Sequence, residues 1–190
     1  MTATDTSPRR PSGAPPMPPS TAGPIRMGSA RRHLGSGFLR QLMRALLQRT
    51  TAASVRVGPE TVGRIGAGLV VLLGVGPDDD EATADALARR VTELRIFDDA
   101  EGRTNLSLAD VGGAALVLSQ FTLYADTRRG RRPGFTGAAA PELAERLYLR
   151  FAAALRELAV EVATGRFGAV MEVELVNDGP FTIWLDTAEH

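Results

Sequence analysis

Short apolar stretches with the spacing of β-strands begin at Met43 and continue to the C-terminal end of the chain. Alternation of apolar and polar positions, and runs of β-branched residues, both predict strands. Residues 68–75 contain only Gly, Leu and Val, which suits a strand buried on both faces. The predicted strands are residues 43–49, 53–57, 60–65, 68–75, 95–98, 114–122, 160–163, 170–176 and 181–185.

Two segments have helical spacing instead. The first, of about fifteen residues, follows Asp78, Asp79 and Asp80, whose charges favour a helix N-terminus. Helix caps explain these aspartates better than a metal cluster does. The second begins at Pro141, a residue suited to the first helical position, and runs to about Leu158. We therefore expect a single α/β domain: a mainly antiparallel or barrel-like sheet with two main helices packed on it.

Residues 1–42 lack this pattern. They hold most of the prolines, many small polar residues, six arginines and one acid, whereas the remainder carries sixteen arginines and twenty-one acids. Such a composition cannot bury enough surface to offset the entropy of ordering. We interpret residues 1–42 as a disordered extension or as the product of a wrong start codon, with Met43 as the initiator. A weak electrostatic arm for nucleic acid and a targeting peptide are the alternatives, and residues 43–190 form the predicted domain.

The residue types that the domain lacks restrict its chemistry. The chain contains no Cys and no Lys, and its two histidines, His33 and His190, lie outside residues 43–189. This excludes a Ser-His-Asp triad, a Cys-His pair, a Schiff base and nearly all zinc sites. An enzyme built from this chain would work with carboxylates, hydroxyls, amides, arginines and backbone groups.

Two polar stretches interrupt the apolar pattern. Residues 177–182, Asn-Asp-Gly-Pro-Phe-Thr, stand between two predicted strands and are typical of a hairpin turn. Residues 118–123, Leu-Ser-Gln-Phe-Thr-Leu, end an apolar strand with a Ser-Gln pair. A buried Gln needs several hydrogen-bond partners, although polar residues also occur where a strand simply leaves the core.

Taken together, the two stretches resemble the signatures of the D-aminoacyl-tRNA deacylase family, S-Q-x-x-L and N-x-G-P-x-T, and both are intact. The resemblance extends over essentially all of residues 43–187, from Met-Arg-Ala-Leu-Leu-Gln-Arg at 43–49 to Phe-Gly-Ala at 167–169. It implies a homodimeric hydrolase, with active sites at the subunit interface, that cuts the ester between tRNA and a D-amino acid. Glycyl-tRNA mischarged on tRNA-Ala is the second implied substrate.

The resemblance also implies roles for individual residues. Gly179 and Pro180, joined by a cis bond, would form a chiral gate lent to the partner's pocket, excluding the Cβ of an L-residue. Arg49 would brace this loop. Asn177 and Thr182 belong to the same motif and are the further substrate-binding candidates.

The implied catalytic residues are those of the first signature. Backbone amides near Phe121 and Thr122 would stabilise the oxyanion while the ribose 2′-OH of the substrate helps to activate water. Gln120 would orient substrate or water, and Ser119 would support the strand. Thr122 as a nucleophile is the less favoured alternative, because the sequence places no base near it.

The loop of residues 126–135 carries four arginines in five positions, which are Arg128, Arg129, Arg131 and Arg132. A solvated surface loop and weak contact with tRNA phosphates both fit them, and a tRNA substrate favours the second. The resemblance implies a cytoplasmic enzyme with no cofactor, no metal, and no membrane or DNA partner.

Three departures from the family pattern stand out. Gly134 replaces the usual Ser, which puts loop rigidity or substrate contact in doubt, and Thr50 replaces a common Val, which puts only packing in doubt. The extension of residues 1–42 is not a family feature. Two alternatives to the deacylase remain at this point: a related deacylase with a trans Gly-Pro bond and other substrates, and a non-catalytic RNA-binding or dimeric scaffold.

Overall fold

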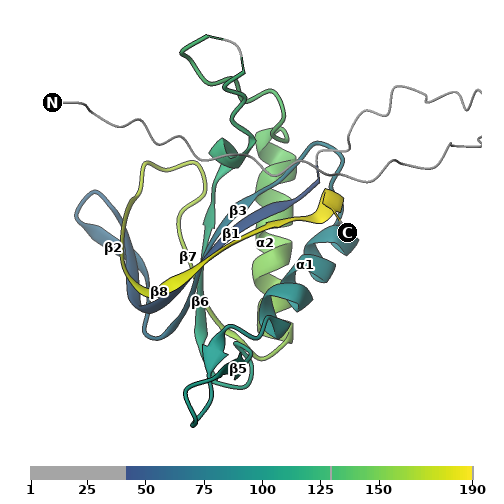
Figure 1. The fold of residues 1–190 in the computed structure, drawn as a ribbon. Helices are drawn as coiled ribbons and strands as arrows, with labels where there is room; N and C mark the ends of the chain where they lie inside the picture. The colour runs from purple at the N-terminus through teal and green to yellow at the C-terminus, as the bar shows by residue number, and fades with distance from the viewer. Residues whose placement is uncertain (1–41, 129, 190) are drawn as a thin grey trace, which may run out of the picture. The chain divides into compact units, whose positions relative to one another are not determined.

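One long strand, β1 (Arg44–Val57), organises the sheet of this protein (Figure 1). The structure is a computed structural model that describes residues 42–128 and 130–189. β1 pairs antiparallel with β2 (Glu60–Ile65), β3 (Gly68–Gly74) and β8 (Glu172–Asp186). The sequence predicted two strands, 43–49 and 53–57, which is wrong, because pairing with β8 continues on both sides of Thr50. The interpretation of residues 1–42 falls, apart from Leu42, outside the described residues.

Parallel strands complete the six-stranded sheet. β3 pairs parallel with β6 (Ala114–Ser119), which pairs parallel with β7 (Glu161–Thr164), in the order β2-β1-β3-β6-β7. The sheet curls until β2 meets β7: a Cβ at Gly63 would lie 2.7 Å from the carbonyl oxygen of Thr164. The barrel-like expectation is therefore confirmed. β4 (Phe97–Asp98) and β5 (Thr104–Leu106) form a separate two-stranded sheet.

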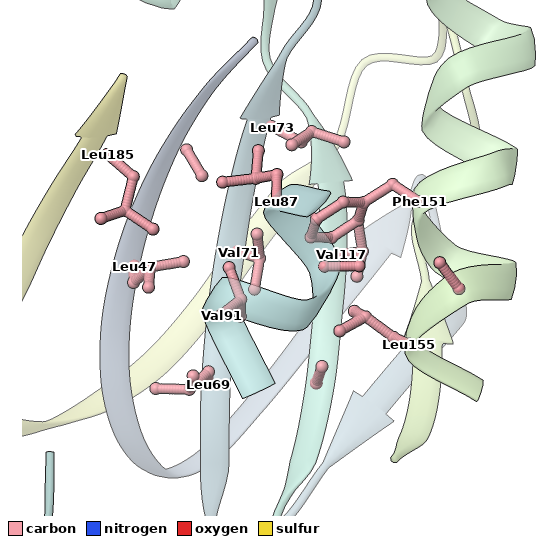
Figure 2. Close-up of a cluster of buried hydrophobic side chains, with 14 of the residues drawn as sticks. Leu47, Leu69, Val71, Leu73, Leu87, Val91, Val117, Phe151, Leu155 and Leu185 are labelled. Atoms are coloured by element: carbon pink, nitrogen blue, oxygen red, sulfur yellow. The ribbon is translucent and has the colours of Figure 1, made fainter. Parts of the chain in front are cut away.

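Helices α1 (Glu81–Glu93) and α2 (Pro141–Glu157) confirm both predicted helices. Asp80 caps α1 by accepting a hydrogen bond from the Thr83 amide at 2.8 Å, as its position predicted. The apolar stripes of both helices cover one face of the sheet (Figures 1 and 2). The main core lies there, and its large buried side chains include Leu47, Leu69, Val71, Leu73, Leu87, Val91, Leu147, Phe151 and Leu155. A smaller cluster fills the opposite, curled face.

The stretch 177–182 is not a hairpin turn. β8 runs without interruption from Glu172 to Asp186, and both of its halves pair with β1. Asn177 lies opposite Thr50 and Thr182 lies opposite Gln48, so four residues of β8 face the single position 49. The prediction failed because turn residues also suit a bulge, and the free edge of β1 can accept both halves.

The apolar run 114–122 also differs from its prediction. The strand ends at Ser119, and a 3₁₀-helix, η1 (Phe121–Tyr124), follows it. A second such turn, η2 (Thr187–Glu189), comes directly after β8. The first polar signature therefore lies at the point where β6 gives way to η1.

Candidate active site

The Ser119–Tyr124 segment leaves the sheet beside the end of β3 and is called the catalytic turn below, after the role that the resemblance implies for it. Ser119 is partly buried and lies in register with Leu73, whose carbonyl accepts a hydrogen bond from the Gln120 amide at 2.7 Å. Within the turn, the Leu123 amide donates to the Gln120 carbonyl at 3.2 Å. The first N–H groups of a helix have no acceptor inside it. The amides of Phe121 and Thr122 occupy these positions and are therefore suited to bind an anionic oxygen.

Side chains of the catalytic turn bond to one another. The Gln120 amide nitrogen donates to the hydroxyl oxygen of Thr122. An amide NH₂ group cannot remove a proton, so this neighbour does not activate Thr122 as a nucleophile. The Phe121 ring is 55% exposed, and its edge meets Phe135 at a ring-centroid distance of 5.0 Å.

A pocket of about 440 Å³ opens beside the catalytic turn. Its lining is predominantly apolar and includes Ser119, Phe121, Phe135, Phe167 and Met171. The sequence reasoning did not select the last three as site residues, although Phe167 is part of a stretch that carried the resemblance. The sequence signal that could have marked Phe167 is an aromatic residue directly before Gly-Ala. That Phe167 lines the same pocket as Ser119 follows only from the fold. A pocket of this kind can hold a flat, largely apolar group.

The arginine-rich loop begins and ends close to this pocket. Asp126 and Gly134 exchange two backbone hydrogen bonds, of 2.8 and 3.0 Å, and so close the loop. Arg128 is held by the carboxylate of Asp126 through two bonds of 2.8 Å, while Arg131 and Arg132 are exposed. Arg129 lies outside the described residues. A Cβ added at Gly134 would meet no atom within 4 Å, so the glycine leaves room for the usual serine.

The second signature forms the bulge of β8 (residues 178–181), which is called the gate loop below, after the role that the resemblance implies for it. Gly179 and Pro180 are exposed at its tip, and the bond between them is cis. Arg49 holds the base of the loop, because its Nε donates to the Asp178 carbonyl at 3.2 Å and lies 2.9 Å from the Asp178 carboxylate. Its guanidinium also lies over the Phe181 ring, 4.2 Å from the centroid.

Arg49 is itself held in place by contacts with residues outside the gate loop. Only 5% of the residue is exposed, and one guanidinium nitrogen donates to the Ile96 carbonyl at 2.7 Å. The Asp98 carboxylate lies 3.4 Å from the same nitrogen. The planar fork of an arginine can bond in these several directions at once, which a lysine cannot do. Arg49 thus connects the gate loop to the segment between α1 and β4 and to β4 itself.

Thr50 does more than pack. Its hydroxyl lies 2.6 Å from the Ala52 carbonyl and 2.8 Å from the Val176 carbonyl, and it accepts from the Ala52 amide at 3.2 Å. A valine has no group that makes these bonds. The expectation that this departure affects only packing is therefore wrong. The pairing of β1 with β8 shifts its register on both sides of Thr50, and this part of β1 is called the bend below. Thr50 ties the bend to β8 just before the gate loop.

Asn177 and Thr182 flank the gate loop on its two sides. The Asn177 side-chain oxygen accepts a hydrogen bond from the side-chain Nε2 of Gln48 at 3.3 Å. Thr182 is exposed and lies opposite the same glutamine in the strand register. Gln48 therefore joins the two sides of the loop across β1.

Within one chain the gate loop and the catalytic turn lie apart. Arg49, opposite the gate loop, is in register with Leu69, whereas the catalytic turn starts beside Leu73. Four residues of strand are about 13 Å, and the three strand spacings from β8 through β1 and β3 to β6 add roughly 14 Å across the sheet. The structure thus keeps each predicted motif together but does not bring the two motifs into one pocket.

One buried carboxylate lies near the start of β1. Asp79 is only 6% exposed, and its oxygens accept from the amides of Met43 at 2.8 Å and Gly76 at 2.7 Å. Burial raises the pKa of Asp79 to about 6, since the loss of hydration outweighs these two bonds. The described residues include no group of three or more His, Cys, Asp or Glu placed to hold a metal. Over that same part of the chain, the helices are too short or too polar to cross a membrane.

Known proteins are similar to this chain in sequence and in fold. The sequence profile of the family described as D-Tyr-tRNA(Tyr) deacylase matches residues 46–186. A D-aminoacyl-tRNA deacylase from Roseiflexus sp. (strain RS-1) is 63% identical over 146 residues, covering 77% of this chain and 94% of the relative. One from Symbiobacterium thermophilum is 60% identical, covering 77% of this chain and 97% of the relative.

Two solved structures have the same fold. One, titled c-Myc DNA Unwinding Element Binding Protein, has a TM-score of 0.71 and 38% identity, covering 76% of this chain and 98% of its own. The other, a probable eukaryotic D-amino acid tRNA deacylase, has a TM-score of 0.66 and 21% identity with the same coverage. The profile and the two relatives together show that this chain belongs to the D-aminoacyl-tRNA deacylase family.

Proposed function

We propose that this protein hydrolyses the ester of D-aminoacyl-tRNA and releases the free D-amino acid and tRNA. The observation that carries the proposal is the catalytic turn, which presents the amides of Phe121 and Thr122 at the rim of an apolar pocket. It stands in a chain that matches the family over residues 46–186. Such a chain, with no Cys or Lys and with no His within residues 43–189, needs a reaction that runs on backbone groups and water.

The chemical step is the attack of water on the ester carbonyl carbon. The carbonyl oxygen becomes an anion, which the Phe121 and Thr122 amides stabilise, an effect worth about 3 kcal/mol for one good donor. The ester C–O bond then breaks, and the proton from water passes to the departing ribose oxygen. The ribose 2′-OH of the substrate assists the attack, and Gln120 orients the substrate or the water.

Two copies of the chain complete each active site in this proposal. The gate loop is remote from the pocket of its own chain, so it acts on the pocket of a second copy. β8, which carries the gate loop, lies at an edge of the sheet and exposes apolar side chains. Val173, Val176 and Trp184 are 42%, 60% and 44% exposed, which a second copy would cover.

The gate selects by shape. Gly179 and Pro180, held at the base by Arg49, bind the α-amino group of the substrate and leave no room for the Cβ of an L-residue. Rejection of this kind relies on a clash rather than on a better contact with the correct substrate. Glycine has no Cβ, so glycyl-tRNA, including that mischarged on tRNA-Ala, passes the gate.

The arginine-rich loop contacts the rest of the tRNA. Arg131 and Arg132 are exposed beside the pocket, and Arg128 is 87% exposed despite its bonds to Asp126. Phosphate contacts of this type add affinity without reading sequence. The reaction belongs in the cytoplasm, where aminoacyl-tRNA is made.

The first experiment compares the hydrolysis of D-Tyr-tRNA, L-Tyr-tRNA and Gly-tRNA by the full chain without added metal. Loss of the D-tyrosyl and glycyl esters, with the L-ester spared, is the expected result. Equal loss of the L-ester would contradict the chiral gate. Stable tRNA binding without hydrolysis would favour the non-catalytic scaffold instead.

A mixing experiment tests the composite site. One variant, Phe121→Arg, blocks the pocket at an exposed position, and another, Gly179→Ala, alters the gate. A heterodimer of the two, purified on two different tags, has one site with both changes and one site with neither. We expect it to recover about half of the wild-type rate, by counting intact sites in a two-fold dimer. No recovery over the two parent variants would place both motifs in a site of one chain.

A further inference from the structure

Arg44, the first residue of β1, connects the C-terminal end of β8 to the catalytic turn. Its Nε donates to the Asp186 carboxylate at 2.8 Å, and its Nη1 donates to the Leu123 carbonyl at 3.0 Å. Asp186 is 8% exposed and lies directly opposite Arg44 in the strand register. The sequence reasoning assigned no role to either residue.

Aromatic rings surround the same guanidinium. Its central carbon lies 4.6 Å from the centroid of Tyr124 and 5.7 Å from that of Trp184. Tyr124 is buried, and its hydroxyl donates to the Leu42 carbonyl at 2.7 Å. Burial raises the pKa of Tyr124 above its usual range, so the phenol remains a neutral donor. Arg44 is therefore held in one orientation by a carboxylate and by stacked rings.

The catalytic turn depends on few contacts of its own. Its start is fixed by the bond from the Gln120 amide to Leu73, and its end by the burial of Tyr124 against β3. A Cβ at Gly74 would lie 2.8 Å from the Tyr124 ring, so the turn packs directly on the backbone of β3. The Leu123 carbonyl, which follows the amides of Phe121 and Thr122, is the group that Arg44 fixes.

We infer that Arg44 is a positioning residue for ester hydrolysis, an inference that rests on the proposed function of the catalytic turn. By binding the Leu123 carbonyl, Arg44 sets the orientation of the turn and hence the direction of the Phe121 and Thr122 amides. Oxyanion donors work only when they are aimed in advance at the developing charge. The role differs from that of Arg49, which holds the gate loop and thus affects the choice of substrate.

The test measures kcat and KM with D-Tyr-tRNA, the rate on L-Tyr-tRNA, and the thermal unfolding of each variant. Arg44→Gln removes the charge and one arm of the fork, and we expect kcat to fall roughly tenfold with KM nearly unchanged. Preference for the D-ester should remain. Arg44→Lys keeps a cation that reaches one partner at a time and should recover part of the lost kcat.

Two further variants make the test specific. Arg56→Gln is the matched control, because Arg56 lies on the same strand, is half exposed, and pairs with Glu172 at 2.7 Å. It should leave kcat unchanged. Asp186→Asn keeps the shape of its side chain but weakens the hold on Arg44, and should lower kcat in the same direction as Arg44→Gln. This variant decides the matter if Arg44→Gln does not fold.

Several results would overturn the inference. One is a kcat within twofold of wild type for folded Arg44→Gln, or for Asp186→Asn where Arg44→Gln does not fold. A rise in KM alone, or a loss of D-preference with unchanged kcat, would assign Arg44 to binding or to the gate instead. Equal losses for Arg44→Gln and Arg56→Gln would show a general effect of charge. A wild-type chain without hydrolase activity would overturn the proposed function itself, and the inference with it, before any variant is compared.

Discussion

The catalytic turn and the gate loop are both held by an arginine of β1, yet the two regions are built differently. The turn ends in a buried tyrosine and packs on β3, so its own chain determines where it lies. Among the described residues, Arg49 holds the gate loop at its base, through Asp178 and Phe181, while Gly179 and Pro180 are exposed. A loop that is rigid at its base and free at its tip is suited to act on a second molecule.

The two arginines point to opposite faces of β1, because they are five residues apart in a strand. Arg49 faces the main core with Leu47, and Arg44 shares the other face with Gln48. One strand therefore serves both motifs without placing them together. If the two motifs have the proposed roles, separate supports should allow catalysis and selection to be changed independently.

The largest effect is expected for Arg49→Gln. The change removes a buried cation that touches two carbonyls and two carboxylates, and we expect a loss of about 3 kcal/mol in the free energy of unfolding. Both carboxylates are 45% exposed, which keeps the loss at the low end for a buried pair. Denaturant unfolding measures it. In the folded fraction the preference for D-esters should fall, whereas intact preference would separate Arg49 from the gate.

Next in size is Gly179→Ala. Within its own chain the new methyl group meets only the Asn177 amide nitrogen, at 3.3 Å, so the fold should tolerate it. In a shared pocket it would occupy substrate space, and kcat/KM for D-Tyr-tRNA should fall about a hundredfold, or ~2.7 kcal/mol. As a control, the variant should unfold at the same temperature as the wild type. A variant with normal rates on D-Tyr-tRNA would refute the gate.

Asp79 should make the stability of the protein depend on pH. Its pKa is about 6 in the folded protein against 3.8 for the ordinary side chain, so the folded state binds the proton more tightly. Stability from this group is therefore present at low pH and is lost as the pH rises through 6. Between pH 4.5 and 7 we expect a loss of about 2 kcal/mol relative to Asp79→Asn. The negative charges of Asp80 and Asp186 act in the same direction. Parallel pH profiles of unfolding for both proteins would contradict this.

The smallest effect is expected for Thr50→Val, which restores the common family residue. The side chain keeps its volume but loses the hydroxyl bonds to Ala52 and Val176, and we expect the free energy of unfolding to fall by about 1 kcal/mol. Thermal unfolding measures the loss, and Thr51→Val, at an exposed neighbouring position, is the matched control. Equal stability of the Thr50 variant and the wild type would show that the bend of β1 does not need this hydroxyl.

Strand and helix positions followed well from the apolar pattern, because burial on one face imposes its period on the sequence. Pro141 and Asp80 marked both helix starts correctly, since the rules for helix ends are local. The prediction of a hairpin turn at residues 177–182 was wrong, because these rules are only local. Asn-Asp-Gly-Pro describes a change of direction, and only the pairing of β8 with β1 decides between a turn and a bulge.

Contacts between residues that are far apart in the sequence could not be predicted for the same reason. Arg44 and Asp186 are 142 positions apart, and nothing in the spacing of either predicts their meeting. Thr50 looked like a packing residue, because a threonine and a valine have the same outline. Its hydroxyl matters only where carbonyls of β1 and β8 converge on it.

By itself the sequence determined the fold class, the two signatures, and a chemistry limited to backbone, hydroxyl, amide, carboxylate and guanidinium groups. Local periodicity and residue chemistry are sufficient for these conclusions. Arg49 was expected beside the second signature, and the tertiary structure added that Arg44 holds the first. It also decided that the two signatures lie at different ends of the β1–β3 pairing. These facts depend on strand register, which is a property of paired chains and is not encoded at any single position.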